Sequence, residues 1–260
     1  MLRSGLLLAA VFVAAPAVAA VKTQTVEYTY AETKLKGFLA YDDAVKEKRP
    51  GVLVVHEWWG LDDYAKMRAE MLAKLGYVAF CPDMYGDGKA TEHPKEANEM
   101  ASSVRKNVKV WQGRAAAGLK VLAEQPQVDA TKLAAIGYCF GGATALQLAY
   151  TGADLKAVVT FHAALPAPSD AEAKAVKGKV LVNHGADDFF IKPEAITAFK
   201  AKLEAAKVPL QFESYPGAVH SFTVKGADKK EIKGMAYNAE ADEKSWAAML
   251  KVFGDVFGKK

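Results

Sequence analysis

The residues "KLAAIGYCFGGATALQLAY", Lys132 to Tyr150, place an apolar run directly before a glycine-rich turn and a helical segment. The run "KLAAIGY" is typical of a strand buried on both faces, and "GGATALQLAY" is typical of a helix. Between them, "GYCFG" has the pattern Gly-x-nucleophile-x-Gly with Cys139 at its centre. A strand, a tight turn and an immediate helix are the context that this pattern requires. The segment therefore predicts a cysteine nucleophile at a strand-to-helix turn.

The turn around Cys139 suits a reactive thiol. Gly137 and Gly141 remove side chains from the positions where such a turn crowds its neighbours. Cys139 then lies at the start of the helix, where the positive end of the helix dipole favours a thiolate. The backbone N–H of Phe140 points toward the place where a substrate carbonyl oxygen becomes an oxyanion. The alternative is a buried cysteine in a purely structural turn, so the rest of the chain has to distinguish the two.

Strands and helices alternate along the chain, which predicts an α/β fold with a mostly parallel, doubly wound sheet. Two alternating stretches at 24–30 and 35–41 predict an antiparallel hairpin before that sheet. The region 94–124 is helical in character, with weak breaks near Gln112 and Gly113. Further buried strands are expected at 50–57, 77–83, 155–162 and 178–185, and a last strand at 210–217. Further helices are expected at 61–76, 193–207 and 240–257.

A cysteine nucleophile needs a base, and the base needs an acid that orients it. In the doubly wound hydrolase layout the chain order is nucleophile, acid, base. "VNHGADDFF" supplies Asp187 and Asp188 after the strand "KVLV", and "YPGAVHSF" supplies His220 after the last strand. Asp188 lies one residue further into its loop, whereas Asp187 is better placed to cap the turn. We therefore expect a triad of Cys139, His220 and Asp188.

Other histidines compete with His220 for a functional role. His56 and His184 end strands at the same edge of the predicted sheet, where either could be a hydrogen-bonded packing residue. Together with Glu57 and His162 they form a conceivable ligand set, but the chain has no short pair such as His-x-x-x-His. We therefore expect neither a metal site nor another cofactor.

The composition is that of one large globular domain. A chain of 260 residues can bury a sizeable core, and no repeat or linker divides residues 21–260. The net charge of +4 is scattered, without a basic stripe interleaved with aromatic residues, so no nucleic-acid partner is expected. We expect a single domain that is a monomer.

The first twenty residues, "MLRSGLLLAAVFVAAPAVAA", stand apart from this domain. One arginine, a short apolar run and closing small residues are typical of a secretory signal peptide, with cleavage after Ala19 or Ala20. An uncleaved membrane anchor is the alternative, but the run is short for one. We expect an exported, periplasmic protein without stable membrane insertion.

Export raises the question of whether the two cysteines pair. Cys81 ends the apolar run "YVAFC" and reads as a buried strand residue, while Cys139 lies in the turn. A core of this size is stable without a disulfide cross-link, and the sequence does not place the two cysteines within bonding distance. A disulfide is therefore not expected.

Several segments together resemble the dienelactone hydrolase family of the α/β-hydrolase fold. They are "VVHEWWGL", "GYVAFCPDMYG", "IGYCFGG", "HGADDFF" and "VHSF", and the likeness extends to the closing "AYNAEADEKSWAAML". The family's Cys–His–Asp triad falls on Cys139, His220 and Asp188, and the spacing from Gly185 to Ile191 matches its acid loop. The resemblance implies a carboxymethylenebutenolidase-like hydrolase of small carboxylic esters or lactones, acting through a thioester acyl-enzyme.

The resemblance also implies roles for Glu57 and Trp58. In the family, a glutamate at this place contacts the resting thiol and accepts its proton when substrate binds. The N–H of Trp58 matches the second oxyanion donor, beside that of Phe140. A thiol that ionises only with substrate present is protected from oxidation in an exported protein. The alternative is that Glu57 caps the helix that starts near Asp62.

One departure from the family concerns the substrate. Members that act on dienelactone hold its carboxylate with two arginines, but this chain has Lys89 in the first region, and Val224 and Lys225 in the second. Lysine cannot make the same bidentate contact. The sequence therefore predicts that neutral small esters or lactones are hydrolysed at least as well as dienelactone.

Two other functional classes fit parts of the sequence. A binding protein could retain the fold without turnover, although a complete triad argues against the loss of activity. A thiol redox protein could be built on Cys139, for which Cys81 is the candidate resolving cysteine.

Overall fold

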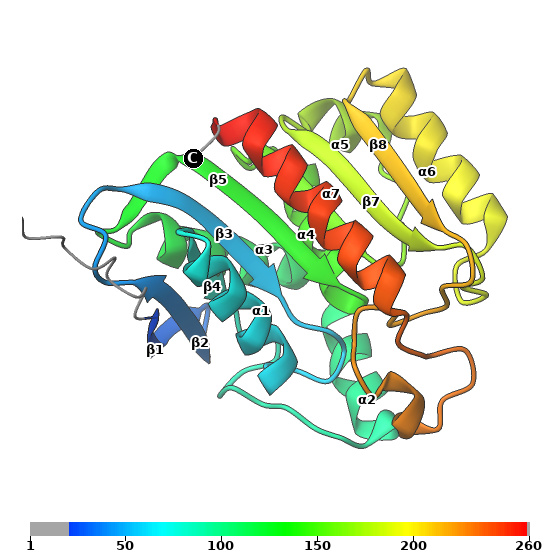
Figure 1. The fold of residues 1–260 in the computed structure, drawn as a ribbon, viewed down its shortest axis with the longest axis horizontal. Coiled ribbons are helices and arrows are strands. Elements are labelled where there is room, and N and C mark those ends of the chain that lie inside the picture. Colours follow the sequence, from blue (N-terminus) through cyan, green and yellow to red (C-terminus); the bar gives the residue numbers. More distant parts are fainter. Residues whose placement is uncertain (1–20, 259–260) are drawn as a thin grey trace, which may run out of the picture.

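The computed structural model describes residues 21–258, and the predicted signal peptide at 1–20 lies outside this range. Eight strands form one sheet in the order β1-β2-β4-β3-β5-β6-β7-β8 (Figure 1). The strands are β1 Val21–Tyr30, β2 Thr33–Asp42, β3 Arg49–Val55, β4 Val78–Cys81, β5 Val128–Tyr138, β6 Ala157–Phe161, β7 Lys179–Gly185 and β8 Leu210–Tyr215.

The strand directions confirm the predicted fold class. β1 and β2 pair antiparallel along their whole length, from Val21 opposite Asp42 to Tyr30 opposite Thr33. β2 also pairs antiparallel with β4, and all the remaining pairs are parallel. The result is a mostly parallel sheet that carries an N-terminal antiparallel hairpin at one edge.

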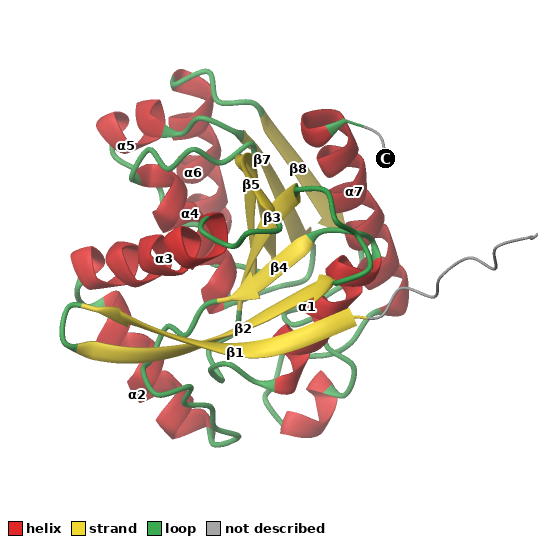
Figure 2. Cartoon of the chain, turned by 90° about the vertical axis from the view of Figure 1, so that its left-hand side faces the viewer, coloured by secondary structure: helices red, strands yellow, loops and turns green. Residues whose placement is uncertain are grey.

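Helices cover both faces of the sheet (Figure 2). α1 and α7 pack on one face, and α3, α4 and α6 pack on the other. No helix within residues 21–258 has both the length and the apolar character needed to cross a membrane. The helices are α1 Asp63–Lys74, α2 Pro94–Arg105, α3 Val108–Ala123, α4 Phe140–Tyr150, α5 Asp170–Ala175, α6 Pro193–Ala205, α7 Ala239–Phe257 and the short 3₁₀-helix η1 Ala227–Lys230.

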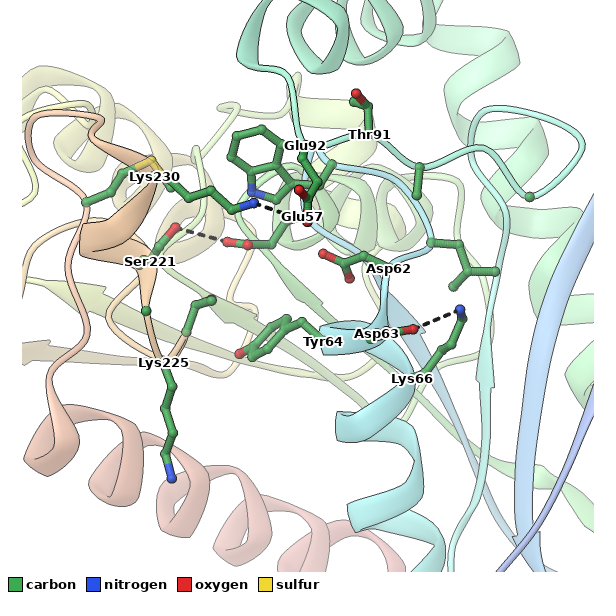
Figure 3. Close-up of a pocket in the computed structure, with 18 residues that line it drawn as sticks. Glu57, Asp62, Asp63, Tyr64, Lys66, Thr91, Glu92, Ser221, Lys225 and Lys230 are labelled. Carbon is green, nitrogen blue, oxygen red and sulfur yellow. Dashed lines mark hydrogen bonds and ion pairs between the residues drawn. The ribbon is translucent and has the colours of Figure 1, made fainter.

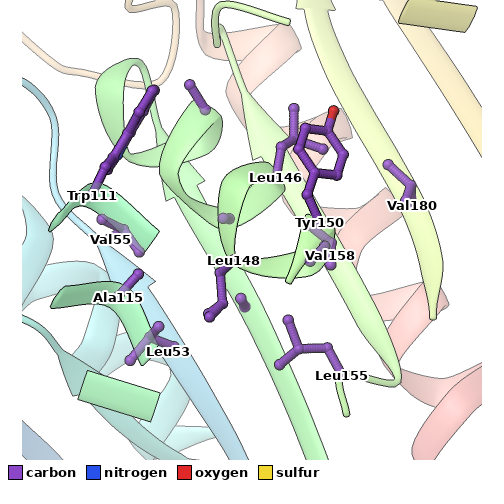
Figure 4. Close-up of a cluster of buried hydrophobic side chains, with 14 of the residues drawn as sticks. Leu53, Val55, Trp111, Ala115, Leu146, Leu148, Tyr150, Leu155, Val158 and Val180 are labelled. Carbon is purple, nitrogen blue, oxygen red and sulfur yellow. The ribbon is translucent and has the colours of Figure 1, made fainter. Parts of the chain in front are cut away.

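The helix after the predicted nucleophile is the centre of the core. Every residue of α4 is buried, and Figure 4 shows Leu146, Leu148 and Tyr150 packed among side chains of β3, β6 and α3. A leucine buried in this way contributes about 1.5–3 kcal/mol relative to an exposed one. The apolar helix therefore fixes the position of the turn from which it starts.

The helical region 94–124 differs from the sequence prediction. It is divided at Lys106 and Asn107, where the Asn107 side chain accepts a hydrogen bond from Val110 and caps α3. The predicted breaks near Gln112 and Gly113 are wrong, because both residues lie inside α3. Gly113 serves close packing instead, since a Cβ there would lie 2.2 Å from the hydroxyl of Tyr30.

The topology brings several functional candidates to one edge of the sheet. The carboxyl ends of parallel strands meet at the same edge, and loops there form the binding sites of open α/β sheets. Here the loops after β3, β5, β6, β7 and β8 carry Glu57, Cys139, His162, Asp188 and His220, respectively.

Candidate active site

The turn between β5 and α4 is strained around Cys139. Cys139 has φ 51° and ψ −113°, a conformation that residues other than glycine rarely adopt and that is found at functional sites. A Cβ on Gly137 would lie 2.0 Å from the carbonyl oxygen of Gly141, and a Cβ on Gly141 would lie 2.2 Å from that of Val55. Both glycines are therefore required by close backbone contacts, as the sequence predicts.

The predicted base and acid are in direct contact. His220 Nδ1 lies 2.7 Å from Asp188 Oδ2, and both side chains are buried. The other carboxylate oxygen of Asp188 accepts a hydrogen bond from the Phe190 N–H at 3.0 Å. Asp187 is exposed to solvent. The geometry thus brings Asp188, and not Asp187, to the imidazole.

Cys139 also interacts with this imidazole. Burial lowers the pKa of His220, but the negative charge of a Cys139 thiolate and hydrogen bonds to Asp188 and Cys139 raise it to about 10. An imidazolium that persists to this pH carries a positive charge beside Cys139. Cys139, His220 and Asp188 therefore form one continuous chain of interactions.

Cys139 and His220 face a cavity of about 660 Å³. Its wall is largely aromatic and aliphatic, which suits an apolar part of a small organic substrate. The exposed ring of Phe190 stands over His220, with ring centroids 5.3 Å apart. Other lining residues include Trp58, Trp111, Phe140, Leu165, Ile191, Ile232 and Met235.

The two predicted oxyanion donors lie at this cavity. Phe140 is the first residue of α4, so its N–H lacks an acceptor within the helix and lies at the positive end of the helix dipole. Trp58 follows Glu57 after β3, and its carbonyl oxygen is held by the Tyr85 hydroxyl at 3.0 Å. Both residues line the cavity that contains Cys139.

Glu57 lines a second cavity of about 480 Å³ (Figure 3). The Ser221 hydroxyl donates to Glu57 Oε1 at 3.0 Å. Burial and the neighbouring Asp62 raise the pKa of Glu57 to about 7, although His220, Ser221 and Lys230 oppose the shift. A carboxyl group with this pKa changes its protonation state near neutrality, as a proton acceptor must.

Cys139 and Glu57 have different neighbours in the structure. Cys139 interacts with His220, while Glu57 Oε1 has Ser221 and, at 3.7 Å, His162 Nδ1 as its neighbours. The alternative role of Glu57 as a helix cap is not what the structure shows, because the Asp62 side chain accepts from the Ala65 N–H at the start of α1.

His56, His184 and Cys81 have structural surroundings. His56 is buried, with Nε2 accepting from the Met84 N–H at 3.4 Å, and His184 packs against Phe212. Within residues 21–258, no three His, Cys, Asp or Glu side chains form a metal-binding cluster. Both cysteines are free, and Cys81 packs on the α1 and α7 face of the sheet, whereas Cys139 packs on the opposite face.

Two cations at the cavity were not identified from the sequence. Arg105, the last residue of α2, lies over the Phe140 ring at 5.5 Å, and Lys192 precedes α6. Of the cations considered from the sequence, Lys225 lines the second cavity instead. No sequence signal could have found Arg105, because only the packing of α2 places it at the cavity.

The dienelactone hydrolase family model matches residues 35–257. The chain belongs to this family. A Saccharolobus solfataricus relative, provisionally named a carboxymethylenebutenolidase, is 30% identical, with 82% of this chain and 91% of the relative covered. The solved structure named m3DLH has 41% identity and a TM-score of 0.89 over 91% of this chain and 99% of its own. A dienelactone hydrolase-like promiscuous phosphotriesterase from metagenomic libraries has 40% identity, the same TM-score and the same coverage.

Family membership supports the α/β-hydrolase fold and hydrolase chemistry on small molecules. The sequence predicts the candidate site residues but not the side chains that hydrogen-bond to them. Ser221, which holds Glu57, directly follows His220 in the chain, so its position beside the base was the available signal.

Proposed function

We propose that the protein hydrolyses small carboxylic esters or lactones through a Cys–His–Asp triad. The observation that carries the proposal is His220, which joins Asp188 at 2.7 Å to Cys139 at the wall of an apolar cavity. Glu57 accepts the thiol proton, and the Cys139 thiolate forms an ion pair with the His220 imidazolium.

In the first half of the reaction, the thiolate attacks the ester carbonyl carbon. The oxygen becomes an oxyanion at the N–H groups of Phe140 and Trp58. The C–O bond then breaks, and His220 gives its proton to the departing alkoxide. The products are an alcohol, or the opened end of a lactone, and a thioester on Cys139.

In the second half, neutral His220 takes a proton from water, and the resulting hydroxide attacks the thioester carbonyl. The thiolate leaves when the tetrahedral intermediate collapses, which restores the ion pair and releases the acid. A thiolate leaves far more readily than an amine, so this chemistry favours esters and lactones over amides.

A chromogenic ester tests this proposal directly. A rapid burst of leaving group, equal to the concentration of Cys139, followed by slower turnover would report the acyl-enzyme. A panel of esters and lactones, with an aryl phosphotriester included because of the phosphotriesterase relative, would define the substrate. A protein that binds these compounds without any release would be a binding protein on a hydrolase fold.

Export of a monomeric mature protein to the periplasm is part of the proposal, on the strength of the signal-peptide pattern at residues 1–20. Fractionation of cells that express the full chain, with mass determination of the recovered protein, tests both export and cleavage after Ala19 or Ala20. Size-exclusion chromatography with light scattering tests the oligomeric state.

Glu57→Gln is expected to slow acylation about 10²-fold or more, because an amide cannot accept the thiol proton. In wild type, the acylation rate should rise with pH through about 7, since Glu57 must be ionised before it can accept a proton. The variant should lose this rise. Stopped-flow release of the chromogenic leaving group from pH 5 to 9 measures both effects.

Glu92→Gln is the matched control, because Glu92 lines the same second cavity and pairs with Lys230 at 3.8 Å. It should retain both the rate and the pH dependence. An unchanged acylation rate in Glu57→Gln would mean that His220 alone controls the ionisation of the Cys139 thiol.

Arg105 and Lys192 change the expectation that neutral esters are the better substrates. The described residues that line the Cys139 cavity include these two cations and no carboxylate. We therefore expect a carboxylate-bearing ester to have a higher kcat/KM than its neutral analogue. Arg105→Gln should lower this preference roughly fivefold, since Arg105 is solvent-exposed.

Lys106→Gln is the control for this prediction, because it removes the same charge one residue further along. It should leave the preference unchanged, and added salt should weaken the preference of wild type. Equal kcat/KM values for the two esters in wild type would contradict this prediction and support the one made from the sequence, that neutral esters are hydrolysed at least as well.

A further inference from the structure

His162 is a buried histidine without an assigned role. It follows β6 directly, is fully buried and has φ 40°, which is strained for a residue other than glycine. Its Nδ1 has no hydrogen-bond partner within residues 21–258 and lies 3.7 Å from Glu57 Oε1. A buried ring nitrogen without a hydrogen-bond partner lowers the stability of the folded protein, so its presence here calls for a functional explanation.

A relay of hydrogen bonds reaches His162 from α1. Arg68 Nε donates to the Tyr64 hydroxyl oxygen at 3.1 Å, and this oxygen lies 2.6 Å from Thr223 Oγ1. Thr223 Oγ1 lies 2.8 Å from His162 Nε2. Arg68 is itself held by Asp242 at 2.5 Å. The relay therefore begins at the Arg68 guanidinium, which can donate hydrogen bonds but cannot accept them.

The distances favour one position for each proton along the relay. The Tyr64 hydroxyl lies 3.4 Å from the Thr223 carbonyl oxygen, which already accepts from Arg68 Nη2 at 2.9 Å, and 2.6 Å from the Thr223 hydroxyl oxygen, so we assign the Tyr64 proton to the closer hydroxyl oxygen. Thr223 then has its own proton to give to His162 Nε2. Neutral imidazole carries one N–H, and with Nε2 as acceptor that N–H is on Nδ1.

We propose that His162 is a positioning residue for Glu57, and that the relay from Arg68 holds its Nδ1–H toward Glu57 Oε1 to stabilise the ionised carboxylate. This inference rests on the proposed role of Glu57 as proton acceptor. It also explains why the nitrogen has no other partner: its acceptor is the carboxylate that takes up the thiol proton.

His162 stays neutral in this role. Burial lowers its pKa well below the usual range, and the nearby charges of His220 and Arg68 act in the same direction. A neutral imidazole can donate from Nδ1 beside an imidazolium, whose ring centroid is 5.3 Å away. The other titratable groups that face Glu57 are Asp62, Tyr64, Tyr138, His220 and Lys230.

The tautomer of His162 tests the inference without any substrate. In ¹⁵N-histidine NMR of the unmodified protein, the His162 signals, assigned by their loss in His162→Asn, should show a protonated Nδ1 and an unprotonated Nε2. A protonated Nε2 would overturn the proposal. Tyr64→Phe should convert this single tautomer into a mixture.

The pH dependence of Cys139 alkylation by iodoacetamide tests the effect on Glu57. In wild type, alkylation should rise through the titration of Glu57, and Glu57→Gln should lose this rise. His162→Phe removes the donor and should shift the rise upward by about one pH unit. His162→Asn, which tolerates the left-handed backbone, provides a second variant without the imidazole.

Tyr138→Phe is the matched control for Tyr64→Phe. The two rings are in contact at 5.1 Å, but the buried Tyr138 hydroxyl has no hydrogen-bond partner within residues 21–258. Only Tyr64→Phe should shift the rise upward, by less than His162→Phe does. An unmoved or downward-shifted rise in His162→Phe would refute the proposal, whereas a wild-type protein that releases no leaving group from any ester would refute only the proposed hydrolase function.

Discussion

Replacing Cys139 with alanine is expected to lower ester hydrolysis by at least about 10⁴-fold while the fold persists. The thiol interacts with His220, which Asp188 holds at 2.7 Å, and alanine leaves no atom there that could attack a carbonyl. Alanine adds no bulk at φ 51°, and the close contacts of Gly137 and Gly141 are unchanged. Steady-state turnover of a chromogenic ester, with circular dichroism and the thermal midpoint, measures both parts of the expectation.

Two further variants sharpen the test of the nucleophile. Cys139→Ser should also be weak, because a hydroxyl needs a stronger base and different positioning. Cys81→Ala removes the other cysteine, which lies in β4 with its Sγ 3.4 Å from the Ala65 carbonyl oxygen, and should retain turnover. Near-normal turnover by a folded Cys139→Ala protein would end the triad hypothesis. Loss of activity in Cys81→Ala with the fold intact would instead favour a redox role for the pair.

The parts of the site that the sequence predicts are those set by local geometry. The glycines around Cys139 are needed because neighbouring backbone atoms leave no space for a Cβ, and a steric requirement of this kind is visible in the sequence. Asp188 and His220 follow apolar strands in the expected order, and parallel strands bring such loops to one edge. Local patterns and sheet topology together therefore place the three residues.

The parts that the sequence does not predict depend on contacts between distant segments. His162 and Thr223 are 61 residues apart, and Arg68 and Asp242 are 174 apart, so no spacing pattern links them. The break between α2 and α3 was misplaced for a related reason. Gly113 reads as a helix breaker, but its absent side chain makes room for Tyr30 from β1.

The second prediction with a large expected effect concerns the two neighbouring aspartates, Asp187 and Asp188. Asp188→Asn is expected to lower kcat by roughly 10³–10⁴-fold, by analogy with other triads, whereas Asp187→Asn should change it less than about twofold. Asp187 is exposed to solvent, while Asp188 is buried against His220. The pair is closely matched, because the two residues are adjacent and each variant exchanges one carboxylate for an amide.

The large loss in Asp188→Asn follows from the orientation of its side chain. Oδ1 accepts a hydrogen bond from the Phe190 N–H at 3.0 Å, so the asparagine carbonyl oxygen would keep this place and its NH₂ group would face His220 Nδ1. Nδ1 would then accept, and the imidazole proton would move to Nε2, the nitrogen that must take a proton from water. Burst kinetics should show loss of both acylation and deacylation. If Asp187→Asn were instead the more damaged variant, the acid would be Asp187 and the loop after β7 would have a different register from the one described.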